Sequence, residues 1–436
     1  MANDVQASDR VTGTGSPDGD LTTDQLGLIV ASALEDVVLG SRILAIVPDK
    51  TRDDNTHILF PEAARKLAAI GVSRIDVLFA QGTHSPMSHA EKLAKIGTDQ
   101  LEPLSNLGEL YDHRWNDPSE LVTIGELSAA EVHRITGGLI AETIPLTVNR
   151  LVANGGYDSI LVFGATMPHE VAGFAGGAKY FFPGVAGPEL THKTHWLAAL
   201  ASVENIIGRI ETPTRHLIEA AADLIKTPVI SFTSVISRTA NDRLRTHALF
   251  AGDIRLALRK AVEVSRHVHV KYTGRKFARV IALLDEHYED LWVGGKASYR
   301  LGGVIEDGGE LIIFAPRLHS ISETHGEYIV RFGGYAPLEL IKEQVANSAE
   351  LRANLCVAAH LSQVAYAGRI DENGDIMKRF RIVLASQVDA GTCKRVNLDY
   401  MNIGDFRLSD FENDPDTLVV DRAGRDLYLV EPFIEN

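Results

Sequence analysis

The sequence predicts an α/β protein with two α/β domains, mostly parallel sheets and an active site in the interdomain cleft. Short apolar runs typical of buried strands alternate with segments whose apolar residues have helical spacing. This alternation is typical of parallel sheets that are covered by helices on both faces. The chain also has 436 residues, which is more than one hydrophobic core usually supports, so two domains are expected.

The first half of the chain contains three units of a helix followed by a strand. Helical spacing or a compact apolar run predicts each element. In chain order we expect a helix at Leu21–Leu39 capped by Thr22 or Thr23, a strand at Ile43–Val47, a helix at Pro61–Ile70, a strand at Ile75–Ala80, a helix at Leu139–Val152 and a strand at Ile160–Phe163. Residues 206–270 are expected to be largely helical, with amphipathic segments at Leu217–Ile225 and Ile254–Val264.

The pattern restarts after the basic stretch Tyr272–Lys276, which we interpret as the domain boundary. The expected elements that follow are strands at Val280–Leu284, Glu310–Phe314 and Ile382–Ala385, a helix from Ala297, and a small β element at Leu418–Val420 and Leu427–Val430. Residues 1–20 are rich in Asp, Gly, Ser and Thr and are expected to be a disordered tail. We therefore predict an N-terminal catalytic domain over 21–272, joined by 410–436, and a C-terminal α/β domain over 273–409.

The composition excludes several classes of protein. Hydrophobic residues make up 45% and charged residues 23%, as in ordinary globular proteins. The formal net charge of −15 lacks the basic footprint that nucleic-acid binding requires. The two cysteines, Cys356 and Cys393, are far apart, which excludes a disulfide scaffold and a zinc ribbon. No run of 18 apolar residues occurs, so we expect a cytoplasmic protein with no nucleic-acid or membrane partner.

Polar side chains follow three of the predicted strands at the point where each strand ends. Asp49 and Arg52 follow the first strand, His84 follows the second, and His169 follows the third. In sheets of this class, ligands bind outside the carboxyl ends of the strands. The sequence therefore predicts one composite site built from these three turns.

A glycine-rich turn and a helix with two histidines follow His169. The four small residues 175–178 allow a ligand to approach the backbone, and Lys179 ends the turn. The turn matches neither the P-loop nor the dinucleotide fingerprint, so standard nucleotide binding is not indicated. Pro188 opens a helix with His192 and His195 on one face, and one or both could bind a metal ion.

The residue types indicate acid–base chemistry on a carboxylate substrate. Arg52 is suited to bind a carboxylate, unless it forms an ion pair with Asp49 or Asp53. His84 and His169 would supply two groups that titrate near neutral pH, as a racemase or epimerase requires. Three alternatives stay open: a zinc or iron hydrolase or lyase that uses the histidines, a cofactor-binding protein without turnover, and an oxidoreductase that releases a 2-keto acid.

The motifs together resemble the nickel-dependent lactate racemase family. The resemblance rests on DKTR at 49–52, GTH at 82–84, PHxxAGFxGGxK at 168–179 and a histidine sixteen residues after that lysine, all in the family's order. It continues into the second domain at Gly295-Lys296 and Gly308–Pro316. It implies a racemase or epimerase of a small 2-hydroxy acid, loaded by separate cofactor-biosynthesis proteins.

The resemblance also implies a cofactor and a role for each residue. The family uses nickel in a nickel-pincer nucleotide, a pyridinium-3,5-bisthiocarboxylic acid mononucleotide. By resemblance, the implied cofactor-binding residues are Lys179 as a thioamide tether, Asp49, Thr51, Phe174, Ala175, Gly176 and Gly177, and the nickel ligand is His195. His84 and His169 would be the acid–base pair, and Arg52 and Lys296 would hold the substrate carboxylate. Trp292 and Val293 stand where lactate-specific members have Tyr-Gln, which favours a short aliphatic 2-hydroxy acid.

Overall fold

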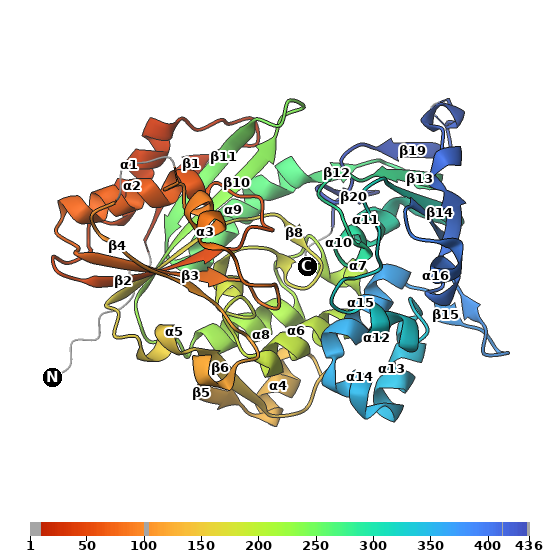
Figure 1. Ribbon diagram of the computed structural model, residues 1–436, viewed down its shortest axis with the longest axis horizontal. Coiled ribbons are helices and arrows are strands. Elements are labelled where there is room, and N and C mark those ends of the chain that lie inside the picture. The colour runs from red at the N-terminus through yellow and green to blue at the C-terminus, as the bar shows by residue number, and fades with distance from the viewer. Residues whose placement is uncertain (1–9, 100–103, 412, 434–436) are drawn as a thin grey trace. The chain divides into compact units, whose positions relative to one another are not determined.

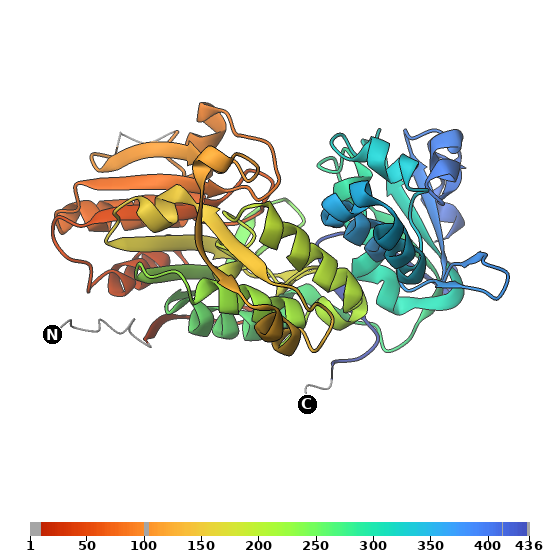
Figure 2. The ribbon, with the colours of Figure 1, turned by 90° about the horizontal axis from the view of Figure 1, so that it is seen from below.

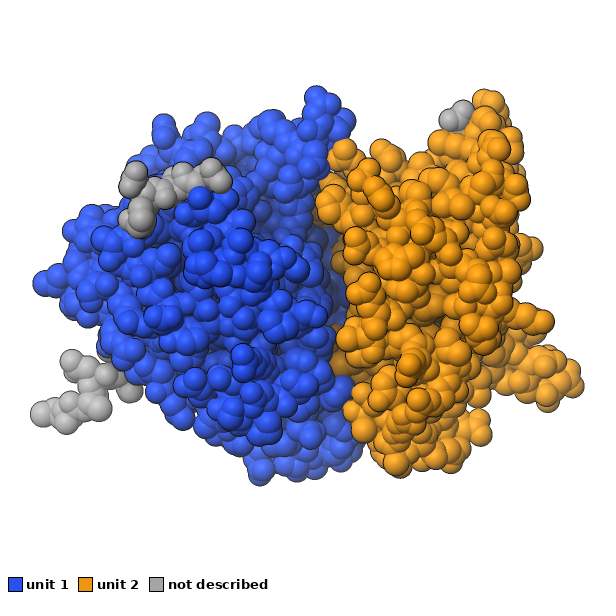
Figure 3. Space-filling model, in the orientation of Figure 1, with its two compact units in different colours: residues 1–194, 210–268 blue, residues 195–209, 269–436 orange. Residues whose placement is uncertain are grey.

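The computed structural model describes residues 10–99, 104–411 and 413–433, and the chain divides into two compact units. Unit 1 contains residues 1–194 and 210–268, and unit 2 contains residues 195–209 and 269–436 (Figure 3). Both are α/β structures with mostly parallel sheets. Among the described residues, none of the helices combines the length and the apolar character needed to cross a bilayer.

Unit 1 is built on a seven-stranded sheet in the order β1-β11-β10-β7-β2-β3-β4, whose strands lie side by side in Figure 2. The five strands β10, β7, β2, β3 and β4 run parallel, while β11 and β1 are antiparallel. The strands of unit 1 are β1 Val11–Gly15, β2 Arg42–Pro48, β3 Arg74–Ala80, β4 Leu107–Asp112, β5 Leu121–Leu127, β6 Ile144–Asn149, β7 Ser159–Ala165, β8 Pro168–His169, β9 Gly173–Phe174, β10 Val229–Arg238 and β11 Leu244–Gly252.

Helices pack on both faces of this sheet (Figure 1). The helices are α1 Thr23–Ala33, α2 Thr56–Ala69, α3 His89–Lys95, α4 Ala129–Ile135, α5 Arg150–Asn154, α6 Pro188–Leu200, α8 Pro213–Ala222 and α9 Ile254–His269, with 3₁₀ turns at Pro118–Glu120 and Gly177–Tyr180. The period of two along β11 separates the faces, because Leu249 and Ala251 join the core under α1 and α2, whereas Ala248 and Phe250 pack against α9.

Unit 2 is built on a five-stranded parallel sheet in the order β18-β17-β14-β13-β19. Its strands are β12 Val270–Tyr272, β13 Phe277–Leu283, β14 Ile305–Ala315, β15 Arg369–Ile370, β16 Ile376–Met377, β17 Arg381–Ser386, β18 Asp399–Asn402, β19 Thr417–Val420 and β20 Leu427–Leu429. Its helices are α7 Val203–Ile206, α10 Leu291–Gly294, α11 Lys296–Leu301, α12 Gly326–Arg331, α13 Leu338–Asn347, α14 Ala349–Ala353, α15 Leu355–Ala365 and α16 Ala390–Arg395, with 3₁₀ turns at Gly302–Val304, Ile403–Asp405 and Leu408–Asp410. Helix α6 continues into this unit from His195 onward.

The predicted strands are confirmed, whereas several other expectations differ from the structure. Residues 206–270 contain the strands β10 and β11 between α8 and α9, because their Val, Ile, Phe and Thr residues pair as sheet neighbours. The segment 139–152, predicted to be a helix, contains the strand β6, which forms a local hairpin with β5, and only the start of the short helix α5. The helix predicted at Leu21–Leu39 ends at Ala33.

Both ends of the chain also differ from expectation. Residues 11–15, expected in a disordered tail, form β1 because they pair with the edge strand β11; residues 1–9 lie outside the described residues. Residues 417–420, expected to join the first domain, form β19 and pair with β13 in the sheet of unit 2.

Candidate active site

Three neighbouring strands bring the predicted site residues of unit 1 to one edge of its sheet. The strands β7, β2 and β3 are adjacent and parallel, so their carboxyl ends lie together. Asp49 directly follows β2, His84 lies four residues after β3, and His169 lies four residues after β7. From β2, the sheet grows towards β3 on one side and towards β7 on the other. This is the kind of switch point at which open α/β sheets bind ligands.

Asp49 is the hydrogen-bond partner of His84. Its Oδ2 lies 2.7 Å from Nδ1 of His84, and its Oδ1 accepts from the Thr51 amide at 2.7 Å and the Thr51 hydroxyl at 2.5 Å. Burial opposes ionisation of Asp49, but the His84 contact, the Arg52 charge and the Thr51 hydroxyl hold its pKa below the ordinary value. An ionised carboxylate only accepts, so Nδ1 of His84 carries a proton, and in the neutral ring Nε2 is the acceptor.

In His169, unlike His84, the Nδ1 atom is a hydrogen-bond acceptor. Its Nδ1 accepts the Val171 amide N–H at 3.1 Å, so the proton of the neutral ring lies on Nε2. The carboxylate of Glu170 lies 3.6 Å from the same Nδ1, which is beyond hydrogen-bond distance. Pairing of His169 with Gly173 across the short β8–β9 hairpin places this histidine at the start of the glycine turn.

Arg52 has a guanidinium that no ion pair engages among the described residues. Asp53, one of its two sequence candidates, pairs with Arg238 at 2.7 Å, and Asp49 pairs with His84. The Arg52 backbone is fixed instead, because its carbonyl accepts from Lys95 Nζ at 2.7 Å. The half-buried guanidinium is therefore available to an anionic ligand.

Lys179 ends the glycine turn with an amine of altered basicity. The residue is half-buried and stands within the 3₁₀ turn Gly177–Tyr180. Burial, followed by the charge of Arg52, lowers the pKa of Lys179 to about 7. A substantial fraction of this amine is therefore neutral, and thus nucleophilic, at neutral pH.

The glycine turn is packed tightly from behind. Gly176 has φ +96°, and a Cβ built there would lie 2.7 Å from the Thr166 hydroxyl oxygen. Gly177 has φ +62°, and its Cβ would lie 2.8 Å from Leu258. Only glycine is accommodated at both positions. The Thr166 hydroxyl is itself buried without a hydrogen-bond partner among the described residues.

Unit 2 contains the remaining predicted residues. Trp292 lies between the rings of His325 and His360, with centroid distances of 4.4 and 4.2 Å. Burial, then the charges of His325 and His195, lower the pKa of His360 to about 3, so His360 is neutral and His195 lies nearby. Lys296 begins α11. Trp292 is thus bordered by two imidazoles, and no sequence signal identified His325 or His360.

Two other groups in unit 1 went unrecognised in the sequence because only the fold brings them to the site. The buried Arg215 of α8 contacts carbonyls of the glycine turn. Gln81 at the end of β3 donates to Ser85 O and to Asp112, which also binds Lys92 at 2.6 Å, and this network fixes the loop of His84.

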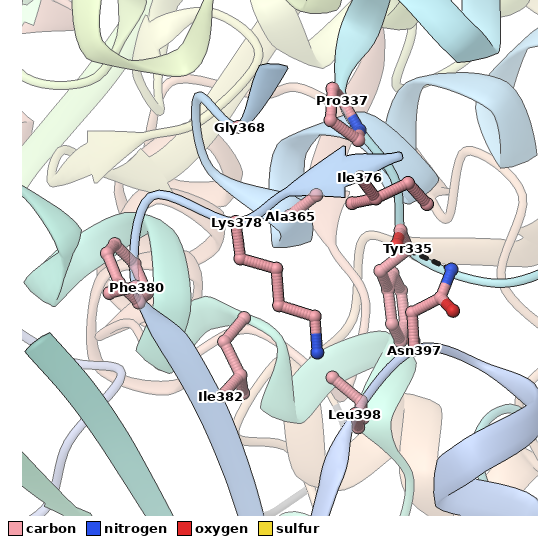
Figure 4. A pocket seen from close by; sticks show the side chains of 10 residues that line it. All are labelled: Tyr335, Pro337, Ala365, Gly368, Ile376, Lys378, Phe380, Ile382, Asn397 and Leu398. Carbon is pink, nitrogen blue, oxygen red and sulfur yellow. Dashed lines mark hydrogen bonds between the residues drawn. The ribbon is translucent and has the colours of Figure 1, made fainter. Parts of the chain in front are cut away.

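Two features bear on other kinds of site. Among the described residues, no three His, Cys, Asp or Glu side chains come together as a metal-binding group. A pocket in unit 2, with an empty volume of about 310 Å³ including its mouth, lies beside the β15–β16 hairpin, and Figure 4 shows Lys378 reaching into it. None of the predicted site residues lines this pocket.

The sequence is similar to known lactate racemases. Residues 26–208 match the family model of the lactate racemase N-terminal domain. The chain is 27% identical to the lactate racemase of Lactiplantibacillus plantarum over 233 residues, 52% of this chain and 49% of that racemase. It is 29% identical to the lactate racemase of Thermoanaerobacterium thermosaccharolyticum over 164 residues, 37% of this chain and 34% of that racemase. These matches span about half and about a third of the two relatives.

Solved structures match over most of the chain. A crystal structure of a Thermotoga maritima protein aligns with a TM-score of 0.85 and 31% identity, over 94% of this chain and 99% of that one. The apoprotein of the lactate racemase from Thermoanaerobacterium thermosaccharolyticum aligns with a TM-score of 0.67 and 18% identity, over 93% of each chain. The latter identity supports a shared fold alone.

Proposed function

Because the chain belongs to the lactate racemase family, we propose that it is an isomerase that racemises or epimerises a 2-hydroxy acid with a nickel-pincer nucleotide. The observation that carries this proposal is the pair of histidines, His84 and His169, which follow the two strands on either side of β2 and whose Nδ1 atoms have opposite hydrogen-bonding roles. The family supplies the reaction class, and these two rings supply a base and an acid for it.

The described residues are compatible with a nucleotide that bonds to a lysine. The lowered pKa of Lys179 leaves an amine able to attack a thiocarboxyl carbon. Gly176 and Gly177 of the turn next to it carry no side chains, and the Thr166 hydroxyl, which has no hydrogen-bond partner among the described residues, lies behind the turn. Lys179 would tether the group, the turn would surround it, and His195 would ligate its nickel.

The cofactor is needed because the C–H bond next to a carboxylate is too weak an acid for histidine alone. When bound, the nickel-pincer nucleotide supplies a hydride acceptor for the hydrogen of C2. The chain's own task is then to hold the carboxylate with Arg52 and Lys296 and to move only the hydroxyl proton. His84 takes that proton at Nε2, and His169 returns one from Nε2 on the other face of the planar 2-keto acid.

The test is a chiral assay of cofactor-loaded protein on single enantiomers of lactate, 2-hydroxybutyrate, malate, phenyllactate and gluconate. Interconversion of the short aliphatic acids is the expected result. Silence across the panel with nickel bound would favour a cofactor-binding protein without turnover, and accumulation of a 2-keto acid would favour an oxidoreductase. Zinc or iron without pincer absorbance would favour a hydrolase or lyase.

Nickel content tests the metal ligand separately. His195→Ala should lose nickel, whereas His192→Ala should retain it, because His192 packs against Trp115 with ring centroids 5.7 Å apart. Nickel retained by His195→Ala and lost by His192→Ala would reverse the two assignments.

A further inference from the structure

Arg215 is a buried arginine whose side chain is directed at the glycine turn. It lies in the first turn of α8, where its amide N–H is capped by the Thr212 hydroxyl at 3.1 Å, and only 3% of its surface is exposed. Its guanidinium donates to three carbonyls of one short segment, those of Ala172 at 3.2 Å, Gly176 at 3.3 Å and Phe174. The alternate residues of the turn are thus bound by one side chain.

These contacts determine which way the peptide groups of the turn face. A trans peptide points its C=O and the following N–H in opposite directions. Because the carbonyls of 172, 174 and 176 are turned towards Arg215, the amides of Gly173, Ala175 and Gly177 are turned away from it. The Ala175 amide accordingly donates to Met167 O at 2.8 Å. Arg215 therefore fixes the orientation of the peptide groups in the turn.

A role limited to filling space would not require arginine here. Burying a guanidinium costs free energy unless its donors are satisfied, and apolar residues of similar volume often serve as well. Its carboxylate partner, Glu219, lies 3.5 Å away and also accepts from Arg255 at 2.8 Å. Most of the donors of Arg215 are used on backbone carbonyls of the turn. Its charge also contributes, after burial and Arg52, to the lowered pKa of Lys179.

We propose that Arg215 is a positioning residue for the cofactor: it holds Ala172–Gly176 in the shape that receives an anionic nucleotide and presents Lys179 to it. The identity of the nucleotide rests on the proposed function, but the hold on the turn does not.

The test compares Arg215→Lys with Arg255→Lys in the cofactor-free protein by amide hydrogen exchange. Lysine keeps the charge but cannot reach three carbonyls, so exchange of residues 173–178 should rise at least about tenfold in Arg215→Lys. Arg255→Lys is the matched control, because Arg255 binds the same Glu219 without touching the turn. Exchange of the turn at the wild-type rate in folded Arg215→Lys would overturn the proposal.

Loading with synthetic nickel-pincer nucleotide gives a second readout. Bound nucleotide per chain should fall in Arg215→Lys and stay unchanged in Arg255→Lys, while the loaded fraction keeps the wild-type KM. If Arg215→Lys does not fold, amide hydrogen exchange of the wild-type protein tests the proposal instead. The amides of 173–178 and of 215–217 should then exchange with the same opening free energy. Separate opening free energies would contradict the proposal. A chain that binds nucleotide but racemises nothing would refute the proposed function alone.

Discussion

The contact between Asp49 and His84 determines which ring nitrogen of His84 carries the proton. The family resemblance implies that Asp49 lies beside the cofactor, and in the structure its carboxylate binds Nδ1 of His84 at 2.7 Å. That hydrogen bond fixes the tautomer, and it would stabilise the charged ring in the proposed step in which His84 takes a proton. Asp49 is therefore expected to affect proton transfer more than cofactor affinity.

Asp49→Asn should lower kcat by roughly 100-fold to 10,000-fold, because an amide neither holds the charged ring nor fixes its tautomer. Steady-state rates in both directions, with bound nickel measured in parallel, check this. The matched control is Asp53→Asn, which disturbs only the exposed Arg238 pair four residues away in sequence. Loss of bound nickel with an unchanged rate per bound nickel would show that Asp49 acts in cofactor binding and not in proton transfer.

Lys179 gives a pH dependence whose sign follows from its pKa. The folded protein binds this proton less tightly, with a pKa of about 7 against 10.5 in the unfolded chain. Between these values the unfolded state holds more protons, so the contribution of Lys179 to stability rises with pH. Lys179→Met should therefore stabilise the protein most below pH 7, on the order of 2 kcal/mol after allowance for partial exposure.

Thermal unfolding of wild type and Lys179→Met at pH 6.5 and 9.5 measures this effect. The difference in Tm should be larger at pH 6.5 and should shrink towards pH 9.5. A Tm difference that is the same at both values would mean that Lys179 titrates normally in the folded protein.

The glycine turn is the element whose backbone shape the site depends on. Gly177 has φ +62°, and an added Cβ would meet Leu258 at 2.8 Å. Gly137 has φ +63° with open space around it. The two positions share the same backbone strain and differ only in packing.

Gly177→Ala should lower the free energy of unfolding by roughly 2–4 kcal/mol, from the strain of a positive φ plus the contact with Leu258. Gly137→Ala should cost about 1 kcal/mol, from the strain alone. Chemical denaturation of both variants measures the difference, and nucleotide loading should fall only in Gly177→Ala. An equal loss of unfolding free energy in the two variants would show that the turn accommodates a Cβ at Gly177 without a packing penalty.

The secondary-structure elements show how much of the fold can be predicted from the sequence. Apolar runs such as Ile43–Val47 predict the parallel strands, and polar residues at three strand ends predict the neighbourhood of Asp49, His84 and His169. The strands β10 and β11 form a local hairpin, but their other partners, β7 and β1, are distant in sequence, and these tertiary contacts override the local helical spacing.

Contacts between distant elements account for the rest. The sequence gives no sign that Arg215 of α8 binds the turn at 172–176, or that Trp292 lies between His325 and His360, because each contact spans tens of residues. By contrast, the proposed acid–base role of His84 is predicted from a local motif that follows a strand. Residue types predict what the site contains, and the fold decides which groups touch.

At the scale of the whole molecule, unit 2 is assembled from two separate stretches of chain. Residues 195–209 belong to it, and Trp196, Ala199, Val203 and Ile207 are part of its hydrophobic core. This core therefore depends on a segment that precedes the rest of the unit by about sixty residues.

Trp196→Ala should destabilise unit 2 by about 3–5 kcal/mol, the usual cost of removing a large buried aromatic side chain. Amide exchange should accelerate in β13 and β14 of unit 2 and change much less in β2 and β3 of unit 1. Faster exchange confined to β2 and β3 would contradict the assignment of residues 195–209 to the core of unit 2.

The division of the chain inside helix α6, between Thr194 and His195, limits how such a gene can recombine. A single crossover near residue 269 would combine residues 195–209 of one protein with residues 269–436 of another. The four core side chains of 195–209 would then have to pack against a core with a different sequence. Two crossovers, exchanging 195–209 together with 269–436, would keep the core intact. New combinations of the two units should therefore arise by paired exchange, and His195 would travel with the incoming unit while Lys179 stays behind.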